Sequence, residues 1–247
     1  MMKLRKSERK RVKIRLGIQG PSGSGKTYGA LLVAYGICND WSKIAIIDTE
    51  SNSADLYAHL GEYNVLSMSQ PYSPESYIGA IEICEKAGIE VIIIDSISHE
   101  WEGIGGILDT HGKMTGNSFT NWSKLAPRHN NLVGHILSNP CHMIVTIRSK
   151  QDYILTERNG KMIPQKVGMK AITRDGLDYE MTLMFDLDAN QYVKVTKDRT
   201  SHFKNRPEFK LSIGVGKSIV KWCNELQVKN HDTKPANSTT HKLGASN

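Results

Sequence analysis

One eight-residue run has the residue types and the spacing of a phosphate-binding loop, G-x-x-x-x-G-K-T: Gly20-Pro21-Ser22-Gly23-Ser24-Gly25-Lys26-Thr27. Its glycines let successive backbone N–H groups turn toward the α- and β-phosphates of a nucleotide. Lys26 can then reach the β- and γ-phosphate oxygens, and Thr27 can ligate Mg²⁺. Tyr28 follows directly and is a further candidate nucleotide-binding residue. The run predicts a site for ATP and Mg²⁺.

Two carboxylates are expected to complete the chemistry of this site. Asp95 ends an apolar run and is placed to hold Mg²⁺ or its water shell. The next residue is Ser96 rather than Glu, so the carboxylate that orients the attacking water must come from elsewhere. Glu50, just past the neighbouring apolar run, is the candidate for that task. Glu100 is the alternative base, and a helix cap or surface acid is the non-catalytic interpretation of Glu50.

The elements around these residues predict an α/β fold with a mostly parallel central sheet, flanking helices and late antiparallel strands. A strand at 12–18 precedes the loop, and a helix at 28–37 follows with its N-terminus facing the phosphates. Continuous apolar runs at 43–48 and 89–95 indicate parallel strands covered on both faces. The other expected elements are helices at 76–87, 125–137 and 216–226, and strands at 141–147, 181–186 and 192–196.

Two polar stretches, 103–124 and 149–175, interrupt this alternation. The first is rich in Gly, Thr, Asn and Ser and predicts a long loop. The second contains Asn159-Gly160, a strong hairpin signal, and is basic. Its cations could contact single-stranded DNA, although a basic hairpin can also be only a solvated protrusion. The candidate DNA contacts are Lys150, Arg158, Lys161, Lys166, Lys170 and Arg174.

Charge divides the chain into three expected parts. Residues 1–15 hold eight basic residues and one acid, which accounts for the whole net charge of +7. Such an arm suits nucleic acid as well as it suits solubility. We expect a basic arm at 1–11, one ATPase domain at 12–227 and a disordered polar tail at 228–247. No apolar stretch approaches the roughly 18 residues of a membrane span, which favours the cytoplasm and no membrane partner.

Three further runs carry a family resemblance: 94–103, 146–150 and 197–200. Together with the loop, they resemble the phage and prophage AAA-family ATPases of the RecA-like P-loop superfamily, which are related to single-strand annealing recombinases. The resemblance covers about residues 12–225. It implies a RecA-like core, a cytoplasmic setting in a bacterial or phage-infected cell, and a single-strand-binding protein as a further partner.

The resemblance also implies roles for particular residues. Thr146 and Arg148 match the position of a γ-phosphate sensor. Lys197 and Arg199 match a pair that reaches into a neighbouring subunit's nucleotide as an arginine finger, which implies a homo-oligomeric ring or filament. The alternative for this pair is an exposed strand end with ordinary charges. Trp101 could stack on a base, but its place after a buried strand favours the core.

The function predicted from these features is Mg²⁺-dependent ATP hydrolysis, stimulated by single-stranded DNA, in phage-type recombination or annealing. A small-molecule P-loop kinase is an alternative, but it would need an acceptor-binding acid in place of an intersubunit finger. A nucleotide-dependent binding switch in packaging or defence is a further alternative. Catalytic roles are assigned to Lys26, Glu50, Asp95, Arg148, Lys197 and Arg199.

Overall fold

The computed structural model describes residues 4, 7, 9, 12–158 and 161–225. For residues 153–158, 161–164, 166 and 167 it describes the backbone alone. Most of the expected basic arm at 1–11, all of the expected tail at 228–247 and the expected Asn159-Gly160 turn lie outside the described residues. None of the helices in the described ranges is both long and apolar enough to cross a membrane.

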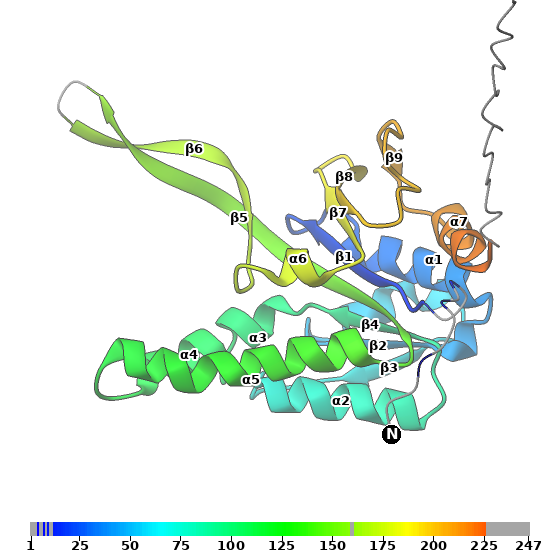
Figure 1. Cartoon of the computed structure of the whole chain (residues 1–247), viewed down its shortest axis with the longest axis horizontal. Coiled ribbons are helices and arrows are strands. Elements are labelled where there is room, and N and C mark those ends of the chain that lie inside the picture. The colour runs from blue at the N-terminus through cyan, green and yellow to red at the C-terminus, as the bar shows by residue number, and fades with distance from the viewer. Residues whose placement is uncertain (1–3, 5–6, 8, 10–11, 159–160, 226–247) are drawn as a thin grey trace, which may run out of the picture.

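In the part of the chain that the structure describes, nine strands form a sheet at the centre of the molecule (Figure 1). Its main path is β3-β2-β4-β5-β1-β7-β8-β9, and the strands from β3 to β7 on this path are parallel. β8 and β9 are antiparallel additions. The strands are β1 (Arg15–Gly20), β2 (Ile44–Asp48), β3 (Asn64–Ser67), β4 (Val91–Asp95), β5 (His142–Arg158), β7 (Leu183–Leu187), β8 (Tyr192–Asp198) and β9 (Phe209–Lys210). The predicted fold class is therefore confirmed.

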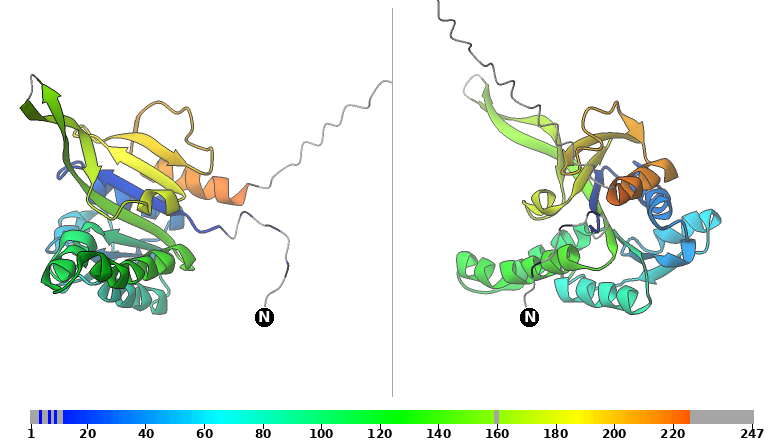
Figure 2. Two further views of the ribbon diagram at one scale, coloured as in Figure 1. Left: turned by 60° about the vertical axis from the view of Figure 1, so that its left-hand side comes forward. Right: turned by 45° about the vertical axis from the view of Figure 1, so that its right-hand side comes forward.

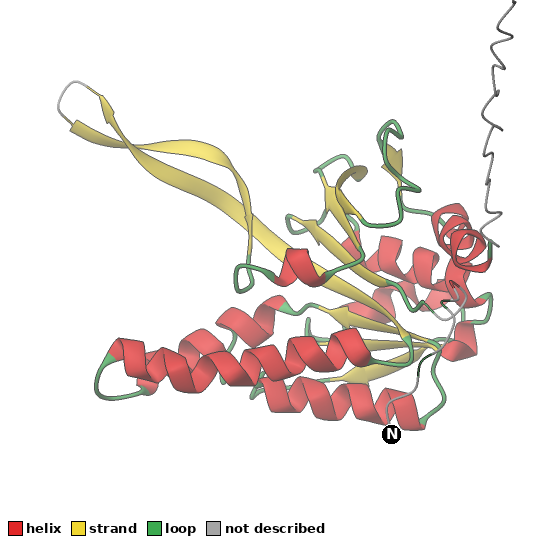
Figure 3. Cartoon of the chain, in the orientation of Figure 1, coloured by secondary structure: helices red, strands yellow, loops and turns green. Residues whose placement is uncertain are grey.

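Helices cover both faces of the sheet, as Figure 3 shows in red and yellow. On one face, α1 (Lys26–Cys38) and α7 (Ile213–Asn224) share a core with Val91 and Ile93 of β4. On the other face, α2 (Pro74–Lys86) and α5 (Ser118–Ser138) share a core with Ile92 and Ile94. Successive strand residues point to opposite faces, so two covered faces require an uninterrupted apolar strand.

The prediction of a long loop at 103–124 is wrong. The structure places α4 (Ile107–Lys113) and the first turns of α5 there. Gly116 has a φ of 95° and turns the chain between the two helices. Asn117 then caps α5 by accepting hydrogen bonds from the N–H groups of Phe119 and Thr120. The small polar residues that indicate a loop thus form a turn and a cap between α4 and α5.

A long hairpin extends from the sheet, with its far end away from the body of the protein (Figure 2). β5 pairs in the sheet through its first half and pairs with β6 (Lys161–Ala171) through its second half. The predicted pairing of 153–157 with 162–163 is confirmed, because Thr156 pairs with Ile163 and Glu157 with Met162. Two short helices, α3 (Ser98–Glu102) and α6 (Leu177–Glu180), follow β4 and precede β7; the sequence patterns gave no signal for either.

Two glycines let α1 and α7 approach closely, and their replacement is expected to destabilise the fold. A Cβ at Gly36 would lie 2.2 Å from the Ile213 carbonyl oxygen, and one at Gly216 would lie 2.2 Å from that of Val33. We expect Gly36→Ala to lower the free energy of unfolding by about 1–3 kcal/mol, measured in urea, because the helices must separate. Gly79→Ala in α2 is the control. Its Cβ would meet nothing within 4 Å, so a gain of about 0.5–1 kcal/mol is expected there.

Candidate functional site

The phosphate-binding loop connects β1 to α1 at the carboxyl edge of the sheet. Gly23 and Gly25 have φ values of 78° and 81°, a region that residues with a Cβ rarely adopt. Gly25 occupies the N-cap position of α1, and among the described residues no side chain caps the helix. The first N–H groups of α1 are therefore left for an anion, which the positive end of the helix dipole also favours.

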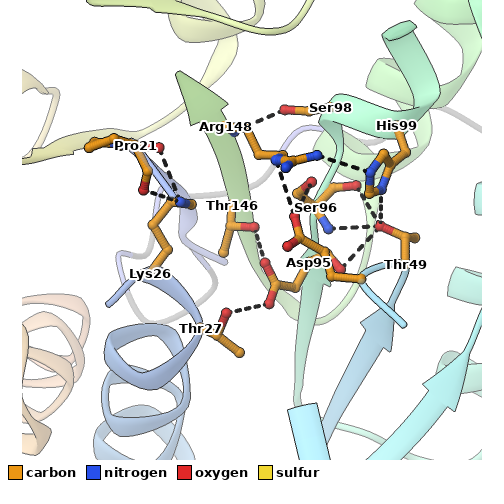
Figure 4. A network of polar contacts seen from close by, with 12 residues as sticks. Pro21, Lys26, Thr27, Thr49, Asp95, Ser96, Ser98, His99, Thr146 and Arg148 are labelled. Atoms are coloured by element: carbon orange, nitrogen blue, oxygen red, sulfur yellow. Dashed lines mark hydrogen bonds and ion pairs between the residues drawn. The ribbon is translucent and has the colours of Figure 1, made fainter. Parts of the chain in front are cut away.

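Lys26 is buried beneath this loop, with an exposed fraction of 8%. Its Nζ donates hydrogen bonds to the carbonyl oxygens of Gly20 at 3.0 Å and Pro21 at 2.8 Å (Figure 4). Burial lowers the pKa of Lys26, and the charges of Asp95 and Glu50 oppose that effect. A buried ammonium held by two neutral carbonyls would gain from an anionic ligand. The buried Ser24 Oγ also lacks a hydrogen-bond partner among the described residues. Both observations fit a bound phosphate chain.

Asp95 joins the loop to the centre of the sheet. Its side chain is 1% exposed, and its Oδ2 accepts a hydrogen bond from Thr27 Oγ1 at 2.6 Å. Thr146 Oγ1 donates to Oδ1. Burial raises the pKa of the Asp95 carboxyl, and the hydrogen bonds from Thr146 and Thr27 oppose the rise. The two residues expected to hold Mg²⁺ are therefore adjacent. Thr146, expected to sense the γ-phosphate, is fully buried and supports Asp95.

Glu50 lies in the segment after β2, next to Asp95, because β2 and β4 pair with Asp48 opposite Asp95. Asp48 organises this segment by accepting hydrogen bonds from the N–H groups of Glu50 at 2.6 Å and Ala54 at 2.8 Å. Glu50 Oε1 accepts a hydrogen bond from Ser96 Oγ at 3.1 Å and lies 3.6 Å from Arg148 Nε. The carboxylate is thus oriented by a serine on one side and a guanidinium on the other.

His99 connects Arg148 to the segment after β2. Arg148 Nη1 lies 3.3 Å from His99 Nε2, and His99 Nδ1 lies 2.7 Å from Thr49 Oγ1. Because a guanidinium can only donate, Nε2 must accept, so the imidazole is neutral and carries its proton on Nδ1. Thr49 Oγ1 accepts that proton's hydrogen bond together with one from the Ser96 N–H. One neutral histidine therefore holds Arg148 in place beside Glu50.

Acidification is expected to weaken this network through His99. Burial is the main cause that lowers the pKa of His99 below its ordinary 6.5, while Glu50 opposes the shift and Arg148 adds to it. The unfolded chain then binds a proton that the folded chain resists. The stability that His99 contributes is therefore complete above pH 6.5 and is lost as the pH falls from 6.5 through the lowered folded pKa. Melting temperatures measured across this range test the expectation.

His99→Gln is the matched variant, because an amide oxygen can accept from Arg148 without titrating. The acid-induced fall in melting temperature should be smaller in this variant than in the wild type. Burial also lowers the pKa of His142, to about 4, and that of His202, so only the difference between the two proteins reports on His99. An identical fall in both would show that protonation of His99 does not destabilise the fold.

These groups meet at a cleft of about 320 Å³. That volume lies within the range of small-molecule sites. Two lining residues carry no motif and were not identified from the sequence: Tyr57, whose ring centroid is 5.7 Å from that of Tyr28, and Gln191 from the turn between β7 and β8. The lining residues are Ser22, Gly23, Gly25, Lys26, Thr27, Tyr28, Glu50, Tyr57, Asp95, Arg148 and Gln191.

Lys197 and Arg199 lie away from the cleft of their own chain. β8 begins beside the cleft and runs to the opposite edge of the sheet, where Lys197 pairs with Met184. Lys197 Nζ donates to the carbonyl oxygens of Asp178, at 2.9 Å, and Tyr179. The side chain of Arg199 is exposed. Glu100, the alternative base, is also absent from the cleft lining, because it is fully buried with Oε1 3.0 Å from His129 Nδ1.

The candidate DNA contacts divide into two groups. Lys150, Lys170 and Arg174 line a second cavity at the base of the hairpin. The side chains of the other three, Arg158, Lys161 and Lys166, lie outside the described residues.

Two cations from the basic N-terminal segment have structural contacts. Arg15 is 5% exposed, donates to the carbonyl oxygens of Cys141 and Leu137, and has its pKa lowered by burial to about 10. Arg9 stacks on Trp222, with 4.5 Å from the guanidinium carbon to the ring centroid. Arg15 is therefore part of the core rather than of the basic surface.

A phosphate loop after β1, a buried acid at the end of β4, which is separated from β1 by β5, and a parallel sheet covered on both faces define a P-loop nucleotide-binding protein. A family described as an AAA domain matches residues 12–210, and the chain belongs to this family of P-loop ATPases. No curated protein matches the chain.

Proposed function

We propose that the protein is a RecA-like ATPase that hydrolyses ATP and acts on single-stranded DNA in phage-type recombination or annealing. The observation that carries the ATPase part is the cleft in which Lys26, Thr27, Glu50 and Asp95 converge. A kinase would place an acceptor-binding acid there, and the acid at this position, Glu50, instead faces Ser96 and Arg148. That arrangement suits a group that orients water.

The residues of the cleft divide the chemistry between them. Mg²⁺ bound with ATP would neutralise charge on the phosphates, and Thr27 and Asp95 are the residues that would hold it. Lys26 supplies a positive charge within the loop, and the uncapped N-terminus of α1 supplies N–H donors. Glu50 Oε1, held by Ser96 Oγ, orients the attacking water and accepts its proton.

Assembly is proposed to complete the site. Lys197 and Arg199 lie at the end of β8 that is far from the cleft of their own chain, and Arg199 is exposed. In a ring or filament they would reach the nucleotide of a neighbouring subunit. Such fingers are worth about 10³–10⁵ in rate. We therefore expect ATP turnover per subunit to rise with protein concentration.

DNA is the proposed partner of the hairpin face. Support comes from Lys150, Lys170 and Arg174, which gather at the hairpin base, and from the resemblance to annealing recombinases. A single-strand-binding protein and the cytoplasm of a bacterial or phage-infected cell complete the proposal. A nucleotide-dependent binding switch remains the second candidate, favoured by Arg148, whose Nε lies 3.6 Å from Glu50 in the described conformation.

The decisive experiment mixes two inactive proteins. Lys26→Ala lacks a working loop but keeps Arg199, whereas Arg199→Ala keeps its loop but lacks the finger. If the finger acts in trans, an equal mixture with oligo(dT) should regain a substantial part of wild-type ATP turnover, although each variant alone is inactive. Lys86→Ala, which removes an exposed cation on α2, is the control and should behave as the wild type.

Three outcomes would overturn parts of the proposal. A turnover that is independent of protein concentration and of oligo(dT) would contradict an assembled DNA-dependent ATPase. Full activity of Arg199→Ala alone would show that Arg199 is not an arginine finger. Phosphorylation of a metabolite in place of hydrolysis would establish a kinase instead.

A further inference from the structure

A second cavity lies between the helices α3 to α5 and the base of the β5–β6 hairpin. Its volume is about 740 Å³, more than twice that of the nucleotide cleft. α4 and α5 extend along the same side of the molecule as the hairpin, which is visible in Figures 1 and 2. The nucleotide chemistry described above uses none of its lining residues. The cavity therefore requires an explanation of its own.

One wall of this cavity is aromatic. Trp101 of α3 and Trp122 of α5 both line it and are both only partly buried. Their rings are stacked, with centroids 5.9 Å apart and planes inclined by 26°. His111 of α4 stacks on Trp122 at 4.3 Å, so three rings from three helices form a continuous series. Tryptophans that only filled the core would be buried, whereas these present ring surface to a cavity.

The aromatic wall is held rigidly from behind. His129 packs edge-on against Trp101, with centroids 6.0 Å apart. His129 Nδ1 also lies 3.0 Å from Oε1 of the fully buried Glu100. This contact ties α3 to α5, so the indoles keep their positions without a ligand. A wall that is ordered beforehand loses little conformational entropy when it binds.

Three cations also line the cavity: Lys150 of β5 and Lys170 of β6 on the hairpin side, and Arg174, whose Nη1 donates to Asn130 Oδ1 of α5 at 3.0 Å. Lys150 Nζ is 3.9 Å from Glu102, and Lys170 Nζ is 4.0 Å from Asp175, at the outer limit for ion pairs. The two lysine side chains are 65% and 54% exposed. Exposed pairs of this kind contribute about 0–1 kcal/mol, so a phosphate can replace either acid at small cost.

We propose that this cavity holds an unpaired base of single-stranded DNA, stacked on the indoles of Trp101 and Trp122. The flanking phosphates would contact Lys150, Lys170 and Arg174. The proposal rests on the proposed function, because it assumes a single-stranded DNA partner. Unpaired bases can lie flat on an aromatic ring, whereas the bases of a duplex are already stacked on one another.

The balance of charge in the lining favours base stacking as the main contribution of this cavity. Three acids, Glu102, Asp152 and Asp175, offset the three cations, so the cavity adds little net charge to the DNA-binding face. Its contribution to affinity should come from ring contacts, which are tolerant of sequence. Alanine variants of the tryptophans and of the lysines are therefore expected to differ in how their DNA affinity depends on salt concentration.

The cavity also shares two elements with the nucleotide cleft. α3 carries His99, which holds Arg148, and Trp101, which lines the cavity. β5 carries Arg148 in the cleft and Lys150 in the cavity, two residues apart and therefore on the same face of the strand. A base that shifts α3 or β5 would alter the groups that orient Glu50. Through α3 and β5, DNA bound in the cavity could therefore stimulate ATP hydrolysis in the cleft.

Binding of fluorescein-labelled oligo(dT), followed by anisotropy over a series of salt concentrations, tests the proposal. Trp101→Ala and Trp122→Ala should each weaken binding about 5- to 150-fold, the range for the loss of one base–aromatic stack, and leave the salt slope unchanged. Trp101→Phe should retain most of the affinity. Lys170→Ala should reduce the slope of log K against log salt by about 0.7, as expected for one lost phosphate contact.

Tryptophan fluorescence gives a second, independent measurement. In a Trp41→Phe/Trp222→Phe protein, the two remaining tryptophans are those of the cavity, and oligo(dT) should quench their emission. A duplex of equal length should quench it much less. Circular dichroism melts establish that each variant is folded, and Trp222→Phe alone should bind oligo(dT) as the wild type does.

The outcomes separate this inference from the proposed function. If wild-type protein binds oligo(dT) but Trp101→Ala and Trp122→Ala bind equally well, or if binding causes no quenching, the cavity is not the base site and only this inference fails. If wild-type protein binds no single-stranded DNA, both the proposed function and this inference are contradicted. Equal quenching by duplex would contradict recognition of unpaired bases.

Discussion

Replacing Lys26 with alanine is expected to lower ATP turnover by on the order of 10²–10³-fold, the effect of removing one preorganised donor from a reacting phosphoryl group. The structure gives the reason. Nζ is buried among the loop carbonyls of Gly20 and Pro21, where the charges of Asp95 and Glu50 support it and water is largely excluded. Turnover measured over a range of ATP concentrations, with nucleotide binding measured separately, checks the prediction.

The same variant should not be less stable without nucleotide. Burial lowers the pKa of Lys26, which means that the folded chain holds this ammonium at a cost. Removing the charge relieves that cost, so the melting temperature should stay the same or rise. Lys113→Ala is the matched control, because it removes an exposed lysine 2.6 Å from Asp109 on α4 and should leave turnover unchanged. A large loss of stability in Lys26→Ala would show that Lys26 is structural.

The sequence was sufficient for the parts of this site that depend on short-range geometry. The loop follows from its own spacing. The closeness of Glu50 and Asp95 follows from a general property of parallel sheets, namely that neighbouring strands end at the same edge. The structure pairs Asp48 with Asp95, so the inference from two apolar runs, each ending in an acid, was sound.

Other parts depend on register and long-range contact, which local patterns do not contain. Thr146 matches the position of a γ-phosphate sensor, but its hydrogen bond to Asp95 depends on the pairing of β5 with β1 and β4. Gln191 reaches the cleft because the turn after β7 lies beside the loop, where its side chain would be 3.4 Å from a Cβ at Gly25. Gln191 carries no motif, and only the assembled sheet identifies it as a cleft residue.

Local sequence signals were misleading where tertiary contacts took precedence. Arg15 was counted with a basic segment suited to nucleic acid, but its guanidinium binds carbonyl groups in the core. Trp101 was expected to pack in the core, but it lines an open cavity with Trp122, a residue from an expected loop. In both cases the side chain is amphipathic, so its type alone does not decide whether it lies inside or at the surface.

Replacing Glu50 with glutamine is expected to separate nucleotide binding from hydrolysis. The amide keeps the size of the side chain and can still accept from Ser96 Oγ, which is 3.1 Å away in the wild type. It cannot accept a proton from water at neutral pH. We therefore expect ATP to bind with little change while single-turnover hydrolysis slows by about 10²- to 10⁴-fold, the range for a general base.

Glu100→Gln is the control variant, because Glu100 is the other candidate for the catalytic base. Glu100 is fully buried against His129, so its replacement should lower the melting temperature and leave hydrolysis by the folded fraction nearly intact. The reverse pattern would transfer the catalytic role to Glu100. If Glu50→Gln and wild type hydrolyse ATP equally slowly, the cleft is a binding switch: Glu50, with Arg148 Nε 3.6 Å away, would then serve to report the bound nucleotide through α3 and β5.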